Sequence, residues 1–358
     1  MVNIVSYFRA HKHRLATVAL IFGFFVDLIT FRNLNLTYAL FLLSAHLFIV
    51  AFTMLILSVP FRRRDSFFTK VREWLPVLQQ YSTGNLLSAF LILYSASGSL
   101  AASWPFLALV ALAAIGNETL KLEKYRLPFH TSLFFLNLIL FSALASPILS
   151  RSISAATFLL SIFVASIIFF LFQKILRLAS CAALYEHGSR ITRGAALIIV
   201  LTSALYFTNT IPPIPLTLKN ADFYYSVERA GDEYRARDEA RTRFEKYVSF
   251  SPKKLRLTSG DDAYLYTAVF IPARLGTTVV HRWQYWSEKA DAWVTKNTVQ
   301  FPIAGGRAAG YRGFSLTENP TPGRWRVSVE TARGQTLGRI YLFVERAAQA
   351  PLLQSERL

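Results

Sequence analysis

Two apolar stretches of the chain, 77–100 and 104–120, contain polar side chains that are able to bind a ligand or move a proton. Amide, hydroxyl and carboxyl groups are costly in hydrocarbon unless they pair with one another or face a cavity. The set comprises Gln80, Asn85, Ser88, Tyr94, Asn117 and Glu118. It predicts either an intramembrane polar pocket, in which Glu118 carries a proton or binds a headgroup, or a polar bridge between two helices. Sequence alone leaves both interpretations open.

Arginine and aromatic residues are interleaved in three short runs near the C-terminus, at 281–286, 305–312 and 323–326. A flat ring and a forked guanidinium suit the binding of a glycan or a protein surface. Strand alternation places Trp283 and Trp325 on inward faces, where tryptophan fills a β-sandwich core. The arginines are then expected to form an exposed contact surface. This predicted surface comprises Arg282, Arg307, Arg312, Arg324 and Arg326.

No metal or catalytic motif occurs in the sequence. There is no G-x-S-x-G and no P-loop, and the six histidines are scattered along the chain. The formal net charge of +18 would suit nucleic acid, but fifteen of the 39 basic residues lie in loops between apolar stretches, where they face anionic lipid headgroups. These observations predict no cofactor, no metal and no nucleic-acid partner, and they favour a non-enzymatic protein that contacts membrane lipids.

Seven apolar stretches that fill the first 211 residues must position the polar set. They are 14–31, 36–59, 77–100, 104–120, 127–149, 154–173 and 194–211. Each is close to the roughly 20 residues that a helix needs to cross a bilayer. The sequence therefore predicts a transmembrane module over 1–211 with about seven α-helices.

Basic residues between these stretches occur almost entirely in alternate loops. Fifteen lie before the first stretch or in 60–74, 121–126 and 174–193, whereas only Arg32 and Arg151 lie in the other loops. Because positively charged loops stay in the cytoplasm, this pattern predicts a cytoplasmic N-terminus. Seven crossings then place the chain after Pro212 on the opposite side. The predicted location is the bacterial inner membrane, with the C-terminal region in the periplasm.

The remainder of the chain is expected to have three parts. Residues 212–250 begin with a proline-rich segment and are predicted to be an extended, charged connector, whose second half suits either a hairpin or a charged helix. Residues 251–346 predict an all-β, immunoglobulin-like sandwich, and residues 347–358 a flexible tail. The expected strands alternate with a period of two and are 263–271, 278–286, 292–303, 307–316, 324–331 and 337–345.

Several of these motifs resemble a known bacterial family. In the C-terminal region, His281-Arg-Trp283, Tyr311-Arg312, Gly323-Arg-Trp-Arg-Val327 and the run 338–344 resemble the domain-of-unknown-function family twenty-nine-fourteen. The polar motifs around Gln80, 84–90, Tyr94 and 116–118 look like the multi-span module that often precedes that domain. The resemblance implies a membrane module that displays a β-sandwich, and it implies no activity.

Three functions fit these features. The first is a non-enzymatic envelope protein whose periplasmic sandwich binds a protein partner, an anionic glycan or a lipid headgroup. The second is a transporter or membrane-embedded enzyme that acts on a lipid-linked substrate through the polar pocket. The third is an accessory subunit of a larger membrane complex, because Gly84 and Ser88 form a small-residue helix face that lets another helix approach closely.

Overall fold

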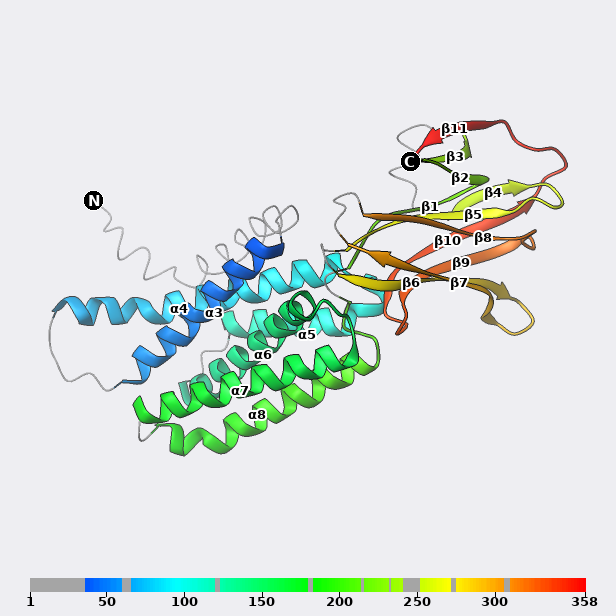
Figure 1. Cartoon of the computed structure of the whole chain (residues 1–358). Coiled ribbons are helices and arrows are strands. Elements are labelled where there is room, and N and C mark those ends of the chain that lie inside the picture. The colour runs from blue at the N-terminus through cyan, green and yellow to red at the C-terminus, as the bar shows by residue number, and fades with distance from the viewer. Residues whose placement is uncertain are drawn as a thin grey trace, which may run out of the picture. The chain divides into compact units, whose positions relative to one another are not determined.

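The computed structural model describes residues 36–59, 66–119, 123–179, 183–213, 216–231, 233–240, 252–271, 275–305 and 310–358. They form two compact units, whose helices and strands are labelled in Figure 1. The first is helical and extends to Ile211, and the second is built of β-strands, runs from Pro212 to Leu358 and also includes 97–102. The expected apolar stretch at 14–31 lies outside the described residues.

The helical unit has six helices in its described part. They are α3 (Leu36–Ser58), α4 (Ser66–Ala96), α5 (Leu100–Thr119), α6 (Glu123–Ser150), α7 (Ala155–Ala179) and α8 (Ala183–Phe207). Five of them are long and apolar enough to cross a membrane, namely α3, α5, α7, the segment Leu127–Ser150 of α6 and the segment His187–Phe207 of α8. The chain is therefore a multi-pass membrane protein by the length and composition of its helices. Helix α4 overlaps the expected stretch 77–100, but it begins earlier, within the expected loop 60–74, ends at Ala96 and is more polar than the other helices.

Helix α6 is the most enclosed of the candidate membrane spans. It contacts α3, α4, α7 and α8, and aromatic rings fill its contact with α7, where Phe135 stacks on Phe169 at 4.4 Å between ring centroids. The opposite faces of α3 and α7 carry exposed apolar side chains such as Phe41, Phe48 and Phe163. An apolar outer surface around a packed interior is the arrangement that hydrocarbon requires.

The six expected β-runs are confirmed as strands. They correspond to β5 (Ala263–Phe270), β6 (Gly276–Ser287), β7 (Ala292–Ala304), β8 (Tyr311–Thr317), β9 (Gly323–Thr331) and β10 (Thr336–Arg346). Strand β9 shows why the alternation was informative. Its inward-facing residues Trp325 and Val327 are buried, whereas Arg324, which faces the opposite side of the strand, is exposed.

Four further strands lie where a connector and a tail were expected. They are β1 (Thr217–Tyr224), β2 (Ser226–Ala230), β3 (Glu233–Glu239) and β11 (Leu353–Arg357). Strand β4 (Lys253–Leu257) lies at the start of the expected sandwich. Strands β2 and β3 pair antiparallel on either side of Gly231, so the hairpin interpretation is correct for this segment. Strand β11 pairs with β3 instead of ending as a tail. Both segments thus belong to the β unit.

The strands form three sheets, with the orders β1-β5-β8, β4-β10-β9-β6-β7 and β11-β3-β2. All neighbours are antiparallel except β4 and β10, which are parallel. The first two sheets enclose a core in which the Phe223 ring of β1 meets the Trp283 ring of β6, with 5.6 Å between centroids. Both side chains are fully buried.

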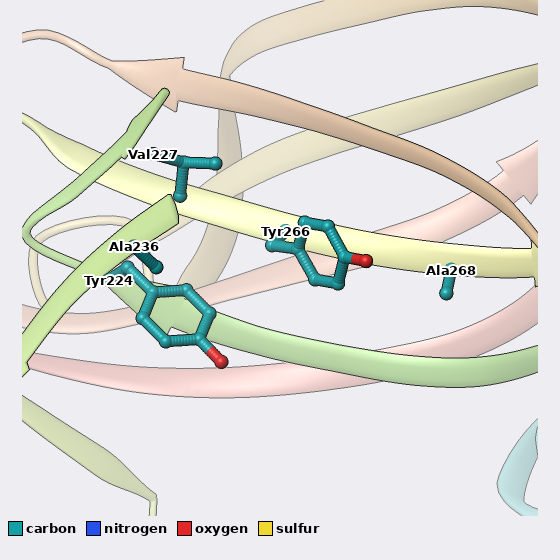
Figure 2. Close-up of a cluster of buried hydrophobic side chains, with 5 residues drawn as sticks. All are labelled: Tyr224, Val227, Ala236, Tyr266 and Ala268. Atoms are coloured by element: carbon teal, nitrogen blue, oxygen red, sulfur yellow. The ribbon is translucent and has the colours of Figure 1, made fainter. Parts of the chain in front are cut away.

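The small third sheet covers the other face of the β1-β5-β8 sheet. Figure 2 shows the buried cluster at this contact, in which Tyr224, Val227, Ala236, Tyr266 and Ala268 lie together. The β1-β5-β8 sheet is therefore the middle of three layers and is covered on both sides. The outer face of the five-stranded sheet has no such cover within the described β unit.

A buried ion cluster links all three sheets. The ammonium group of Lys253 on β4 lies 2.8 Å from Asp238 on β3 and 3.4 Å from Asp222 on β1. It also lies 4.5 Å from the centre of the Tyr224 ring. The side chains of Lys253 and Asp238 are only 7% and 9% exposed, so each charge depends on the other for compensation. This cluster connects the third sheet to the other two sheets.

Candidate functional site

The first candidate site joins α4 to α5 through reciprocal hydrogen bonds. The Gln80 side-chain amide donates to the Glu118 carboxylate at 2.9 Å and to the Asn117 carbonyl oxygen at 3.4 Å. In return, the Asn117 side-chain amide donates to the Gln80 carbonyl oxygen at 3.1 Å. The structure thus brings together three of the six polar residues that the sequence singled out. Their amides bond to each other's backbone, which is the geometry of a bridge between helices.

The other three residues of this set lie elsewhere in the helical unit. Tyr94 is buried and donates its hydroxyl proton to the Leu140 carbonyl oxygen of α6 at 3.1 Å, and its ring packs on Phe106. Ser88 is buried and its hydroxyl has no hydrogen-bond partner among the described residues, while Asn85 is half-buried. These positions spread the predicted set along α4 and do not place it around one cavity.

We expect the Asn117→Ala substitution to destabilise the helical unit. Asn117 is 4% exposed, and its amide supplies one interhelical hydrogen bond, a contribution of about 0.6 to 1.7 kcal/mol in membrane proteins. Thermal unfolding of the full-length protein in detergent should therefore shift to a lower temperature. Ser44→Ala is the control, because the Ser44 hydroxyl bonds only to Leu40 of its own helix. Equal unfolding temperatures for Asn117→Ala and the control would contradict an interhelical bridge.

The second candidate site is the uncovered outer face of the five-stranded sheet. Alternation along β6, β7, β9 and β10 places guanidinium groups and aromatic rings together on this face. We call it the arginine–aromatic face, and it comprises Trp286, Trp293, Arg324, Arg326, Arg339 and Tyr341. Trp286 and Trp293 are direct cross-strand partners with ring centroids 5.3 Å apart, and Trp293 meets Tyr341 at 6.2 Å.

Arg326 is held at the centre of this face by its neighbours. Its guanidinium carbon lies 4.5 Å from the centre of the Trp293 ring, and its Nε donates to the Gln284 side-chain oxygen at 2.8 Å. Strand β6 lies between β7 and β9, so the Trp293 ring must extend across β6 to reach Arg326. Stacking and hydrogen bonding fix the plane of the guanidinium while its remaining N–H donors can serve a ligand.

Most of the arginines on this face have no ion-pair partner among the residues that the structure describes. Arg282 pairs with Glu330, whose carboxylate lies 3.0 Å away, but Arg324, Arg326 and Arg339 form no ion pair with any described residue. Burial, followed by the nearby charge of Arg339, lowers the pKa of Arg326 from its ordinary value. Two like charges held close together favour an anion that neutralises both.

The predicted arginine surface is only partly assembled. Arg282, Arg324 and Arg326 share the outer face of the five-stranded sheet, although Arg282 is already paired with Glu330. Arg312 lies in the middle sheet on β8, where its guanidinium donates to the main-chain oxygen of Leu358 at 3.2 Å. It is therefore part of the packing between layers. Arg307 lies outside the described residues.

Sequence reasoning missed Trp293, Arg339 and Tyr341 of the arginine–aromatic face, and Gln284 beside it, because their placement depends on strand register. Gln284, Trp293 and Tyr341 meet Arg326 from β6, β7 and β10. A β-bulge shifts the pairing of β6 with β7 between Trp283 and Gln284, so that Asn297 opposes Trp283 while Trp293 still opposes Trp286. Period-two alternation cannot reveal such a shift, because an extra residue reverses the faces beyond it. Trp286 itself belongs to 281–286, one of the three runs of arginine and aromatic residues that were expected to suit binding.

His281 is an interior residue and is not available for catalysis. Its Nδ1 lies 2.8 Å from the Ser315 hydroxyl and its Nε2 lies 3.0 Å from the Thr267 hydroxyl, and all three are buried. Trp283 Nε1 donates to Ser315 at 2.9 Å, and Thr267 donates to the Gly313 carbonyl oxygen at 3.5 Å. One consistent assignment follows, in which Ser315 donates to Nδ1 and the Nε2–H of a neutral imidazole donates to Thr267. Burial lowers the pKa of His281 to about 3.

Comparison with protein families gives one match in the β unit. Residues 276–342 match the model of a family described as a protein of unknown function, DUF2914. The match covers β6 to β9 and most of β10, and it confirms the family resemblance of the C-terminal motifs. No activity is assigned to that family. No curated protein matches the chain.

Two solved structures are distantly similar. One is the crystal structure of a β-glucosidase from Listeria innocua, with 12% identity over 34% of this chain and 17% of that chain, and a TM-score of 0.20. The other is an alkylpurine DNA glycosylase, AlkC, from Pseudomonas fluorescens bound to DNA with an abasic-site analogue. It has 13% identity over 88% of this chain and 100% of that chain, and a TM-score of 0.24. Neither likeness carries an inference about fold or function.

Proposed function

We propose that this protein is a membrane-embedded display protein whose β unit binds an anionic partner through the arginine–aromatic face. The observation that carries the proposal is the fixed guanidinium of Arg326, stacked on Trp293 beside Arg339 without an acidic partner among the described residues. A preorganised, uncompensated cation on an uncovered sheet face suits the capture of a negative group. The proposed role is binding and not catalysis.

The proposed topology has seven spans, with the N-terminus in the cytoplasm and the β unit in the periplasm of a bacterial cell. It rests on the alternation of basic loops, in which fifteen of the seventeen basic residues before Pro212 fall on one side. This count requires α4 to cross the membrane. If α4 did not cross, the basic loops 60–74 and 121–126 would lie on opposite sides, and the charge alternation would be lost.

Burial of its polar residues explains how α4 can be a span despite its composition. Gln79, Ser82, Thr83 and Ser88 are all buried inside the helical unit. A helix whose polar side chains face protein does not expose them to lipid, so its overall hydropathy understates its compatibility with the membrane. We therefore retain α4 as the third of the seven proposed spans.

We further propose an immunoglobulin-like sandwich for the β unit. The order β1-β5-β8 corresponds to strands A, B and E of such a sandwich, and β10-β9-β6-β7 corresponds to G, F, C and C′. The buried Trp283 then lies on the strand equivalent to C, where antibody domains also carry a buried tryptophan. The hydrogen bonds of His281 to Thr267 and Ser315 join the two sheets, and they take the place of an inter-sheet disulfide.

Native mass spectrometry of the full-length protein, extracted from its own membranes, tests the binding proposal. We expect the wild type to retain an anionic partner in stoichiometric amount and the Arg326→Gln/Arg339→Gln variant to lose it. The matched control is Arg235→Gln/Arg237→Gln, which removes the same charge from two exposed positions on β3. Retention of the same partner by all three proteins would contradict the proposal, as would loss from the control alone.

A second candidate function is transport or chemistry on a lipid-linked substrate between α4 and α5. It is favoured by one observation, the buried side-chain oxygen of Asn117, which has no hydrogen-bond partner among the described residues. The bonds from Gln80 to Glu118 and Asn117 favour the bridge instead, because they already occupy these groups. Glu118→Gln separates the two functions, since a transporter that depends on this carboxylate would lose activity at unchanged abundance. A role as a complex subunit remains a third candidate.

A further inference from the structure

We infer that the partner of the arginine–aromatic face is a carboxylated glycan, whose acidic groups bind Arg326 and Arg339 while a sugar ring stacks on Tyr341. This inference rests on the proposed function and specifies its ligand class. It is carried by the combination of uncompensated guanidinium groups with exposed ring and hydroxyl groups on the same uncovered sheet face.

The anion-binding part of the site consists of Arg326 and Arg339, with Arg324 beside them. Arg326 uses its Nε for Gln284, one face for the Trp293 ring and a further hydrogen bond for the Tyr341 side chain, so the N–H donors that these groups do not use remain for a carboxylate. Arg339 lies on the neighbouring strand and is exposed, and its charge acts on Arg326. A planar carboxylate accepts two parallel hydrogen bonds from a guanidinium, which is the strongest pairing that such a donor makes.

The sugar-binding part of the site is Tyr341, which lies directly opposite Arg326 on β10. Its side chain is 45% exposed, so a ring face is open to a ligand next to the cationic groups. The exposed hydroxyl groups of Thr295 and Thr298 on β7 add donors and acceptors that suit a polyhydroxylated ligand. An acidic sugar combines both requirements, because it carries a carboxylate on a ring with an apolar C–H face.

The surface is less suited to an acidic protein. A protein interface has a desolvated apolar core, in which large side chains enter pockets on the partner. Among the large apolar side chains of the arginine–aromatic face, only Tyr341 is more than one third exposed, since Trp286 and Trp293 are half-buried against each other and Arg326. No exposed aliphatic side chain accompanies them on this face. The cationic and hydroxyl groups therefore dominate what a ligand meets.

Isothermal titration calorimetry of the full-length protein in detergent micelles tests the inference with three probes. They are a short oligogalacturonate, a neutral malto-oligosaccharide of the same length and a glutamate peptide of the same charge. We expect the oligogalacturonate to bind, and Arg326→Gln/Arg339→Gln to weaken it by roughly tenfold or more. Tyr341→Ala should weaken it by roughly fivefold. The Arg235→Gln/Arg237→Gln control lies away from this face on β3 and should retain binding.

The results separate this inference from the proposed function. Binding of the glutamate peptide that depends on Arg326 and Arg339, without binding of the oligogalacturonate, would overturn the glycan inference and leave the anionic-partner proposal standing. Oligogalacturonate binding that is unchanged by Tyr341→Ala would also overturn the inference. If no probe binds in a way that depends on Arg326 and Arg339, both proposals fail.

Discussion

Substitution of Trp283 by alanine is expected to destabilise the β unit by about 4 kcal/mol, within the range of roughly 3 to 5 kcal/mol for truncating a buried tryptophan. Trp283 is fully buried and lies between the sheets against Phe223. Its indole N–H also donates to Ser315. Truncation therefore removes one donor from the buried series of hydrogen bonds that runs through His281 and Thr267 to the Gly313 carbonyl oxygen. The loss therefore combines a cavity with a broken hydrogen-bond network.

Hydrogen exchange of β5, β6 and β9 in the full-length protein measures this loss. Trp286→Ala is the matched control, because Trp286 is the same residue type on the same strand and faces outward, where it is only half-buried. We expect Trp283→Ala to accelerate exchange throughout these strands and Trp286→Ala to change it little. Comparable acceleration by both substitutions would show that Trp283 is not the core residue that the structure indicates.

The stability of the β unit is expected to fall as the pH decreases from 6.5 toward 3. Burial lowers the pKa of His281 to about 3 in the folded protein, whereas the pKa of a solvent-exposed histidine is 6.5, so between these values the unfolded chain binds a proton that the folded protein excludes. The free energy of unfolding therefore decreases by up to about 1.4 kcal/mol for each pH unit below 6.5. A protonated imidazole would need to donate at Nδ1, where Ser315 already donates.

Urea titrations of the full-length protein between pH 5 and pH 6.5 test this prediction. Tryptophan fluorescence is a suitable signal, because Trp283, Trp286, Trp293 and Trp325 all lie in the β unit. His281→Gln removes the titrating group and should flatten the pH dependence in this range. Glu239 does not interfere: burial would raise its pKa, but hydrogen bonds from Tyr225 and Arg256 lower it below 4.5, so its contribution is lost only at lower pH. An unchanged slope in His281→Gln would contradict the assignment.

The strands from β5 to β10 were predictable because they are runs of β-favouring residues separated by turn residues, and in β9 the inward residues alternate with polar ones. Strand β11 was not predictable in the same way. It has a charged sequence without a buried face, and it becomes a strand only by pairing with β3, more than a hundred residues earlier in the chain. Tertiary pairing of this kind overrides local preference, and composition carries no sign of it. For β2 and β3 the sequence suited either a hairpin or a charged helix, and the pairing of the two strands shows the hairpin.

The candidate sites were predictable by residue type and less so by arrangement. Gln80, Asn117 and Glu118 came from the cost of polar groups among apolar residues, and the structure brings these three together. The arginine surface required knowledge of which sheet each strand joins. Without that knowledge the sequence could not show that Arg312 and Arg326 lie in different sheets, or that Trp293 lies beside Arg326.

Site-specific photo-cross-linking in the native membrane identifies what binds the arginine–aromatic face. A photoreactive amino acid replaces Thr295 or Thr298, which are exposed on β7 beside the arginine–aromatic face, or Arg235 on β3 as a control. We expect an adduct with an anionic molecule at both threonine positions and none at Arg235, and loss of that adduct when Arg326 and Arg339 are replaced by glutamine. Adducts confined to Arg235, or adducts at the threonines that persist without the two arginines, would contradict binding of an anionic partner at this face.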